Sequence, residues 1–302
     1  MKNFHFIKNK KFTLCVIAVV ALIGIVSFFA RGFTIDIDFS GGTEMQIDLG
    51  VEVTSEVCDN INSIIADKLG SDYVSSTTKS TANSTAAIIR TGTAALSTEQ
   101  QTTLQDALIE AYPATDVDTI ELTTIQPTIG DSLTKKAILA VTIAVLLMLG
   151  YIWFRFELAS GIAAVICLAH DLFVMLAIYS LFQIPINSNI IAAFLTILGY
   201  SINATIIVFD RVRENKKLDG GKSEFGEVVN GAVHDTLARS INTTITTLLT
   251  IGMIYILGVD TIKDFALPLI IGIVAGLFSS VFVSGMLWDT LNKYIKPKAE
   301  KK

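Results

Sequence analysis

A few ionisable side chains interrupt the long apolar stretches of this sequence, and they are the first candidates for a functional site. Asp171 and its neighbour His170 lie near the middle of the apolar run 158–182, and Arg239 stands at the mouth of the run 240–258. An ionisable group in hydrocarbon is costly and by default marks a functional site. Because a lone buried carboxylate needs a partner, we predict that Asp171 serves the passage of an ion, whereas His170 is a hydrogen-bonded packing residue.

A polar stripe continues from Arg239 into the following apolar run. Its members recur at helical spacing and so share one face: Arg239, Thr243, Thr246 and Thr250. The run 188–209 offers a comparable face with Thr196, Tyr200 and Asn203. Lipid does not host such faces, so they must contact other helices or water, and helix packing explains them as well as a pathway does. We expect one interior site, with these ion-pathway candidates: Asp171, Asn203, Arg239 and Thr243.

Catalytic and metal-binding patterns are missing from the sequence. One His and one Asp, with no further His or Cys nearby, do not make a metal site. The sequence contains no G-x-S-x-G elbow and no H-E-x-x-H motif, and the loop "LDGGKS" lacks the spacing of a phosphate-binding loop. We therefore expect no enzyme activity, no metal and no cofactor.

Composition places these residues in a membrane protein. The chain has 302 residues, of which 51% are hydrophobic and 17% charged. Six apolar runs are long enough to cross a bilayer: 12–30, 137–154, 158–182, 188–209, 240–258 and 265–288. Residues 31–134 are acidic, with 16 Asp and Glu but four Lys and Arg, which argues against nucleic-acid binding. The three cysteines imply no disulfide framework.

Charge distribution orients the spans. With the N-terminus inside, 16 Lys and Arg fall on the inner side and seven on the outer side. The first apolar run is longer than the core of a usual signal peptide and no A-x-A site follows, so we expect an uncleaved anchor. The predicted divisions are a cytoplasmic tail 1–11, a transmembrane helix 12–30, an extracytoplasmic domain 31–134, transmembrane helices 2–6 within 135–290 with a cytoplasmic loop 210–239, and a cytoplasmic tail 291–302.

The acidic region alternates strands and helices. "GTEMQIDL", "DYVSSTTK", "STAAIIRTG" and "VDTIELTTI" read as strands, and two capped helices separate them, one beginning near Thr54 and one at Ser97 or Thr98. The order strand, helix, strand, strand, helix, strand is the split-βαβ, ferredoxin-like pattern. The predicted fold is an α-helical membrane protein with six spans and one α+β ferredoxin-like extracytoplasmic domain.

Several motifs resemble one family over essentially the whole chain. "DIDFSGGTEMQI" resembles the D-F-x-G-G signature of the SecD and SecF protein-export subunits, and "GYSINATIIVFDRVREN" resembles the fourth-span signature on the SecF side. Three other stretches resemble parts of the family's other spans. They are the entry to span two in "IQPTIGDSL", span three in "LAHD" and the start of span five in "LARSINTTITTLLT". The signature and structural positions matched are Asp38, Gly41, Gly42, Gly199, Tyr200, Asp210 and Arg211. The pair Gly41–Gly42 suits either a hinge or a tight turn.

The resemblance implies a function in protein export across the bacterial cell membrane. Such subunits pair with SecD in a unit of the resistance-nodulation-division superfamily, which uses the proton motive force, or sodium, to help draw preproteins outward. The implied partners are SecD, the SecYEG channel, the SecA motor, an unfolded preprotein, the lipid bilayer and, as an additional subunit, YajC. By the same resemblance, Arg239 matches the family's fifth-span arginine, which is linked to ion passage. Asn203 matches the family's span-four asparagine, and Asp171 matches its third-span His-Asp pair.

One position departs from the family pattern. Ala204 stands where the family usually has an aspartate, its best candidate for an ion-carrying carboxylate. Two alternatives therefore stay open. The chain could act chiefly as a structural partner, with ion coupling in SecD, or form half of a small-molecule or lipid exporter of the same superfamily.

Overall fold

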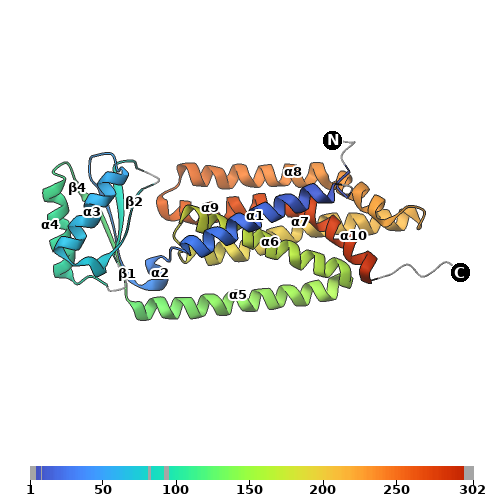
Figure 1. Cartoon of the computed structure of the whole chain (residues 1–302), viewed down its shortest axis with the longest axis horizontal. Helices are drawn as coiled ribbons and strands as arrows, with labels where there is room; N and C mark the ends of the chain where they lie inside the picture. The colour runs from blue at the N-terminus through green and yellow to red at the C-terminus, as the bar shows by residue number, and fades with distance from the viewer. Residues whose placement is uncertain (1–4, 8, 81–82, 92–94, 296–302) are drawn as a thin grey trace.

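The computed structural model describes residues 5–7, 9–80, 83–91 and 95–295 as a long helical bundle with a small α+β domain at one end (Figure 1). We call the end of the bundle beside this domain the domain end. Residues 5–7 and the end of the last helix lie at the opposite end, the termini end. In this part of the chain, six helical segments are long and apolar enough to cross a membrane, as predicted.

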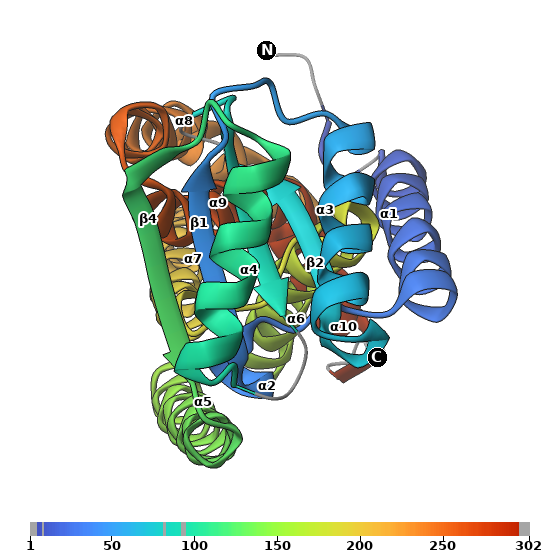
Figure 2. The ribbon, with the colours of Figure 1, turned by 90° about the vertical axis from the view of Figure 1, so that its left-hand side faces the viewer.

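The sheet domain (residues 42–125) has a four-stranded antiparallel sheet in the order β2-β3-β1-β4. Its strands are β1 (Gly42–Asp48), β2 (Val74–Lys79), β3 (Ala86–Thr91) and β4 (Asp116–Ile125). The helices α3 (Ser55–Lys68) and α4 (Thr98–Ala111) cover the sheet face turned away from the bundle (Figure 2). Met45, Ile47 and Ile89 pack there against Ile61 and Leu104. This arrangement confirms the predicted ferredoxin-like pattern.

Capping residues fix where the two domain helices begin. The Thr54 hydroxyl accepts a hydrogen bond from the Val57 N–H. Ser97 and Gln100 form a reciprocal capping box at the start of α4, which satisfies two backbone N–H groups that the helix leaves free. The sequence prediction of two capped helices is therefore correct, and Ser97 rather than Thr98 is the cap.

The bundle consists of α1 (Lys10–Arg31), α5 (Pro127–Arg155), α6 (Leu158–Phe182), α7 (Asn189–Asp219), α8 (Phe225–Leu257) and a last composite span. That span runs through α9 (Asp260–Phe278), a π-helical turn (Ser279–Val283) and α10 (Ser284–Ile295). It is the most buried of the six, whereas α5 and α8 lie at the edges and are mostly exposed (Figure 1). A short helix, α2 (Ile37–Ser40), joins α1 to the sheet.

The predicted loop 210–239 is mostly helical. Helix α7 continues to Asp219 and α8 already begins at Phe225, so residues 220–224 make the link. Gly220 and Gly221 adopt φ values of 61° and 82°, which end α7 in a conformation that glycine allows. The first part of α8 belongs to the bundle, because Val229 and Val233 pack into its core.

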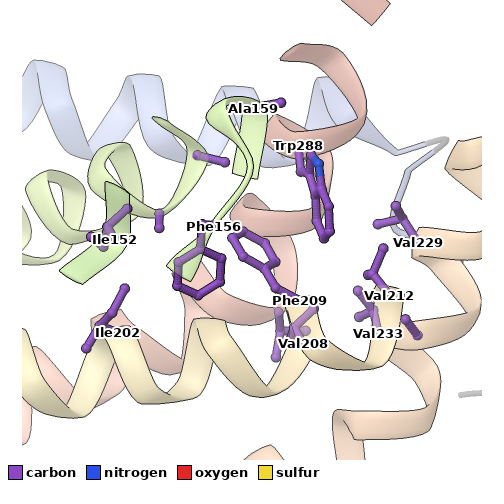
Figure 3. Packing of buried hydrophobic residues seen from close by; sticks show 14 of the residues in the cluster. Ile152, Phe156, Ala159, Ile202, Val208, Phe209, Val212, Val229, Val233 and Trp288 are labelled. Atoms are coloured by element: carbon purple, nitrogen blue, oxygen red, sulfur yellow. The ribbon is translucent and has the colours of Figure 1, made fainter. Parts of the chain in front are cut away.

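Aromatic and branched side chains fill the core near the termini end. Figure 3 shows Phe156, Phe209 and Trp288 grouped together, with Val229 and Val233 on the adjoining side. The Phe209 ring meets Trp288 edge-on with centroids 4.8 Å apart, and Phe156 with centroids 5.9 Å apart. This packing joins α6, α7, α8 and α10 into one unit.

Candidate functional site

Asp171 of α6 is completely buried at the centre of the bundle, and polar groups from three elements surround its carboxylate. The Ser201 hydroxyl of α7 donates to Oδ2 at 2.5 Å, and the Ser279 hydroxyl donates to the same oxygen at 2.8 Å. The Nδ1 atom of His170 lies 3.0 Å from Oδ1. A buried carboxylate in a membrane-spanning bundle is therefore fully provided with hydrogen-bond partners.

The π-helical turn begins at Ser279, one of the groups that bind Asp171. In this wider turn the Ser284 N–H donates to the Ser279 carbonyl oxygen, and the Cys167 thiol lies 3.9 Å from that same oxygen. Single π-turns inside α-helices occur often at functional sites. Here the turn widens the helix and brings the Ser279 hydroxyl to the carboxylate.

Small residues line the contact between α9 and α7 beside the carboxylate. A Cβ atom at Gly276 would lie 3.4 Å from Cβ of Ser201 and 3.7 Å from Oδ2 of Asp171. An alanine would fit there in ordinary van der Waals contact. One turn earlier, a Cβ atom at Gly272 would overlap the side chain of Ile197, so glycine is needed there for α9 to approach α7. Close approach through small residues is how membrane helices bring polar side chains into contact without lipid between them.

The chemistry available at Asp171 is the gain and loss of one charge. A hydroxyl can donate to a carboxylate and can also accept from a protonated carboxyl group, so both serines serve either state. Three oxygen atoms, Oδ2 of Asp171 and the two serine hydroxyls, converge there and are also the ligand type of hard cations. Among the described residues, no group of three or more His, Cys, Asp or Glu is arranged to hold a metal ion.

The remaining ion-pathway candidates lie elsewhere. Asn203 of α7, Arg239 and Thr243 of α8 are exposed on the surface of the bundle, whereas Asp171 is enclosed. The stripe faces outward because the opposite side of α8 packs on α7 and α9, where the Tyr200 hydroxyl donates to Thr244 Oγ1 at 3.3 Å. We expected one interior site, but in this chain the structure separates the candidates into two features. One is the enclosed carboxylate of Asp171, and the other is an outward polar face.

Small residues continue the outward face onto α7. Gly199 and Thr196 are exposed there, and a Cβ atom added to Gly199 would meet no heavy atom within 4 Å. Ala204 is half-buried beside Asn203. A smooth polar face at membrane depth leaves room for another helix to approach closely.

Asp210 and Arg211 belong to a charged network at the termini end. Asp210 accepts from Arg155 at 3.0 Å and from Arg213 at 3.4 Å. Arg211 donates to Asp235 of α8 at 2.9 Å and to Glu214 at 2.8 Å. These exposed pairs link α5, α7 and α8 and lie away from Asp171.

Gly41 and Gly42, the glycines of the D-F-x-G-G signature, form a tight, packed turn. Gly41 has a φ of 74°, and a Cβ atom there would lie 2.8 Å from Cα of Pro127 at the start of α5. Gly42, with a φ of 133°, opens β1. Asp38 accepts a hydrogen bond from the Ser188 N–H at 2.8 Å and so ties α2 to the start of α7. Of the two roles considered for the glycine pair, this geometry fits the tight turn.

A buried ionic cluster, which the sequence did not reveal, attaches the sheet to the bundle. Arg90 of β3 is 8% exposed, and its Nη2 lies 2.8 Å from Glu44 while its Nε lies 3.1 Å from Asp36, not aligned for a hydrogen bond. Burial raises the pKa of Asp36 and of Glu44 above the ordinary carboxyl value, and the charge of Arg90 opposes this rise. Asp264 of α9 lies within electrostatic reach.

Comparison with known proteins matches this architecture to one family. Residues 104–294 match the family described as "Protein export membrane protein SecD/SecF, C-terminal". The protein translocase subunit SecF of Acidaminococcus fermentans is 34% identical over 299 residues, which cover 98% of this chain and 100% of the relative. The corresponding protein of Desulfurispirillum indicum is 32% identical, with 98% and 94% covered.

Solved structures give the same result for the fold. The crystal structure of SecDF from Thermus thermophilus, a translocon-associated membrane protein, superposes with a TM-score of 0.79 at 31% identity. The match covers 94% of this chain but 38% of the SecDF chain, so this chain spans well under half of that protein. On these matches, the chain belongs to the SecD/SecF family of protein-export membrane proteins and is similar to its SecF members over nearly its full length.

Proposed function

We propose that this chain works as one half of a two-part export complex whose other half is a SecD subunit. The chain spans nearly all of its SecF relatives but 38% of the SecDF chain, so a larger complex has room for a second bundle. The exposed face with Asn203, Arg239 and Thr243 supports such a partner, because lipid is a poor environment for these side chains. A second helical bundle would cover the face and pair with Arg239.

The proposed location is the bacterial cell membrane, with both termini in the cytoplasm and the sheet domain outside. The basic residues of the chain gather at the termini end, whereas the external domain is strongly acidic. This distribution follows the positive-inside rule. A preprotein leaving the SecYEG channel, after the SecA motor has begun export, would then meet the external domain on the outer side. YajC belongs to the same proposed assembly.

We propose that Asp171 is the residue of this chain that changes charge during the working cycle. The observation that carries this proposal is the enclosed carboxylate held by Ser201 and Ser279, with Ser279 at the start of a π-helical turn. Gain or loss of the charge changes which hydrogen bonds are favourable and so shifts the register of the turn between α9 and α10. One charge moved through 100 mV supplies about 2.3 kcal/mol, enough to bias two arrangements of a packed helix.

A second candidate places the coupling carboxylate in the partner. Ala204 brings no charge to the exposed face, while Arg239 lies on that face as an exposed cation. An acidic side chain from SecD opposite Arg239 would make the ion path a shared property of two bundles. In that case Asp171 has a structural role and this chain supplies the arginine.

Export of a reporter preprotein into inverted membrane vesicles, with and without an imposed ion gradient, separates these candidates. Asp171→Asn keeps size and polarity but removes the charge change, and we expect it to abolish the gradient-dependent part of export. Asp210→Asn is the matched control, because Asp210 lies in an exposed network away from the site. If Asp171→Asn behaves like Asp210→Asn while Arg239→Ala abolishes the gradient effect, coupling belongs to the shared face.

A further inference from the structure

The N-terminal strap (residues 5–7) is inserted into the termini end of the bundle. Phe6 is 4% exposed, and its backbone N–H donates to Oδ1 of Asn230 on α8 at 2.9 Å. The Phe6 ring meets His234 of α8 edge-on, with centroids 5.1 Å apart. Ile7 packs against the apolar cluster formed by Cys167, Val283 and Met286. The strap therefore fills a place between helices rather than lying on the surface.

A continuous line of rings leads from the strap to the buried carboxylate. Phe6 contacts Phe282 of the π-helical turn with centroids 5.4 Å apart, and Phe282 stacks on Phe278 at 5.3 Å. Phe278 in turn stacks on His170 at 5.9 Å, and His170 contacts Asp171. Each contact lies within the range of favourable aromatic pairs, so a displacement of Phe6 removes support from the π-turn.

An ion pair fastens the strap at its C-terminal side. The Lys10 Nζ atom lies 2.7 Å from Oδ2 of Asp289, a carboxylate of α10 that is completely buried. Lys293 approaches the same oxygen at 3.1 Å, and among the described residues Oδ1 has no hydrogen-bond partner. Because a buried charge needs a nearby opposite charge, Asp289 holds Lys10, and with it the strap, against the bundle.

We propose that the strap is a gate that closes the termini end of the bundle over Asp171. This inference rests on the proposed role of Asp171 in ion coupling. A coupling site works when it is reached from one side at a time, so something must cover it on each side. Phe6 and Phe282 cover it on the termini side, and release of the strap requires loss of the Asn230 hydrogen bond, the ring contacts and the Lys10 ion pair. The membrane helices keep their own hydrogen bonds throughout.

Cys167 provides a built-in reporter of gate opening. It is completely buried one helical turn before Asp171, and its thiol contacts the carbonyl oxygen of Ser279. The chain has three cysteines, so replacing Cys15 and Cys58 with alanine leaves Cys167 as the single thiol. We would assemble the complex in inverted vesicles and add a small membrane-impermeant methanethiosulfonate to the side that bears the termini.

Phe6→Ala should raise the rate of Cys167 modification at least tenfold over the parent chain. Lys10→Met and Asn230→Ala, which loosen the strap without removing the ring, should raise it by a smaller factor. Phe12→Ala is the matched control, because Phe12 follows closely in sequence but is 62% exposed. The gate is rejected if all of these variants are modified at the parental rate, or if the reagent reaches Cys167 equally fast from the domain side.

A reversible cross-link tests whether the gate must open during export. In a cysteine-free background, the pair Phe6→Cys and His234→Cys lies where the two rings now meet, and oxidation would lock the strap in place. Because this pair also lacks the Phe6 ring, its own reduced form is the reference. We expect oxidation to stop the gradient-dependent export that the reduced form retains, whereas equal export in the two forms would overturn the proposal. Faster Cys167 modification in Phe6→Ala should persist when Asp171 is also replaced, so failure of the gate and failure of the coupling site give different results.

Discussion

Replacing Arg90 with methionine removes the buried cation that joins the sheet domain to the bundle. Asp36 and Glu44 both contact this guanidinium, and methionine keeps an apolar chain without the charge. Removing one partner of a buried ion pair costs about 3–5 kcal/mol. Because the side chain of Glu44 keeps 28% of its surface exposed, the lower end of this range applies. We expect the local stability of β1 and β3 to fall by about 3 kcal/mol.

The effect of this substitution depends on pH with a definite sign. Burial raises the pKa of Asp36 and of Glu44, and loss of Arg90 raises both further. A carboxyl whose pKa is raised by folding destabilises the fold when the pH lies above that pKa. This penalty fades as the pH falls toward the ordinary carboxyl value of about 4. The stability difference between wild type and variant should therefore be largest at about pH 8 and smaller at about pH 5.

Hydrogen exchange of the intact chain measures this difference strand by strand. A loss of about 3 kcal/mol corresponds to exchange about 100-fold faster in β1 and β3 when exchange reports the opening equilibrium. The matched control is Lys79→Met, which removes an exposed pair with Glu52 and should change stability by less than about 1 kcal/mol. A variant that matches this control, or whose deficit grows on acidification, would refute the reasoning.

Three further substitutions probe the remaining contacts. Gly41→Ala, at a φ of 74° and against Pro127, should lower the thermal midpoint of the chain by several degrees more than Gly70→Ala, which has a φ of 105° but open space around it. Ser97→Ala removes the capping box and should destabilise the first turn of α4 by about 1 kcal/mol, seen as faster exchange there. Ser279→Ala should reduce gradient-dependent export while co-purification with SecD is retained. If the variant exports as well as the wild type, the Ser201 hydroxyl alone is sufficient for Asp171.

Local signals were enough to predict much of the fold. Alternation in "GTEMQIDL" and the caps at Thr54 and Ser97 define β1 and two helices, because these features depend on neighbouring residues. Hydropathy alone finds the six spans. The length of α8 was not predicted, because the charged residues between 210 and 239 resemble a loop. A helical signal was present at the start of α8, where apolar residues at helical spacing face the core: Val228, Val229, Ala232 and Val233.

Contacts between distant segments could not be predicted in the same way. Arg90 and Glu44 face each other because β1 and β3 pair in one register, and a pattern within either strand does not fix that register. Ser279 sits in an apolar run where a serine usually serves helix packing. A signal was available in the cluster Ser279, Ser280 and Ser284, which is unusually polar for the centre of a span. Its meaning depends on Asp171, which lies 108 positions earlier in the sequence.

The most direct measurement of the central claim is infrared difference spectroscopy of the carboxyl groups in the assembled complex. Spectra would be recorded as the pH or the sodium concentration is stepped, for wild type and for Asp171→Asn. If Asp171 changes charge during the cycle, the wild type shows a carboxyl signal that responds to the step and that the variant lacks. Identical difference spectra for the two proteins would contradict the account and assign the charge change to the partner subunit.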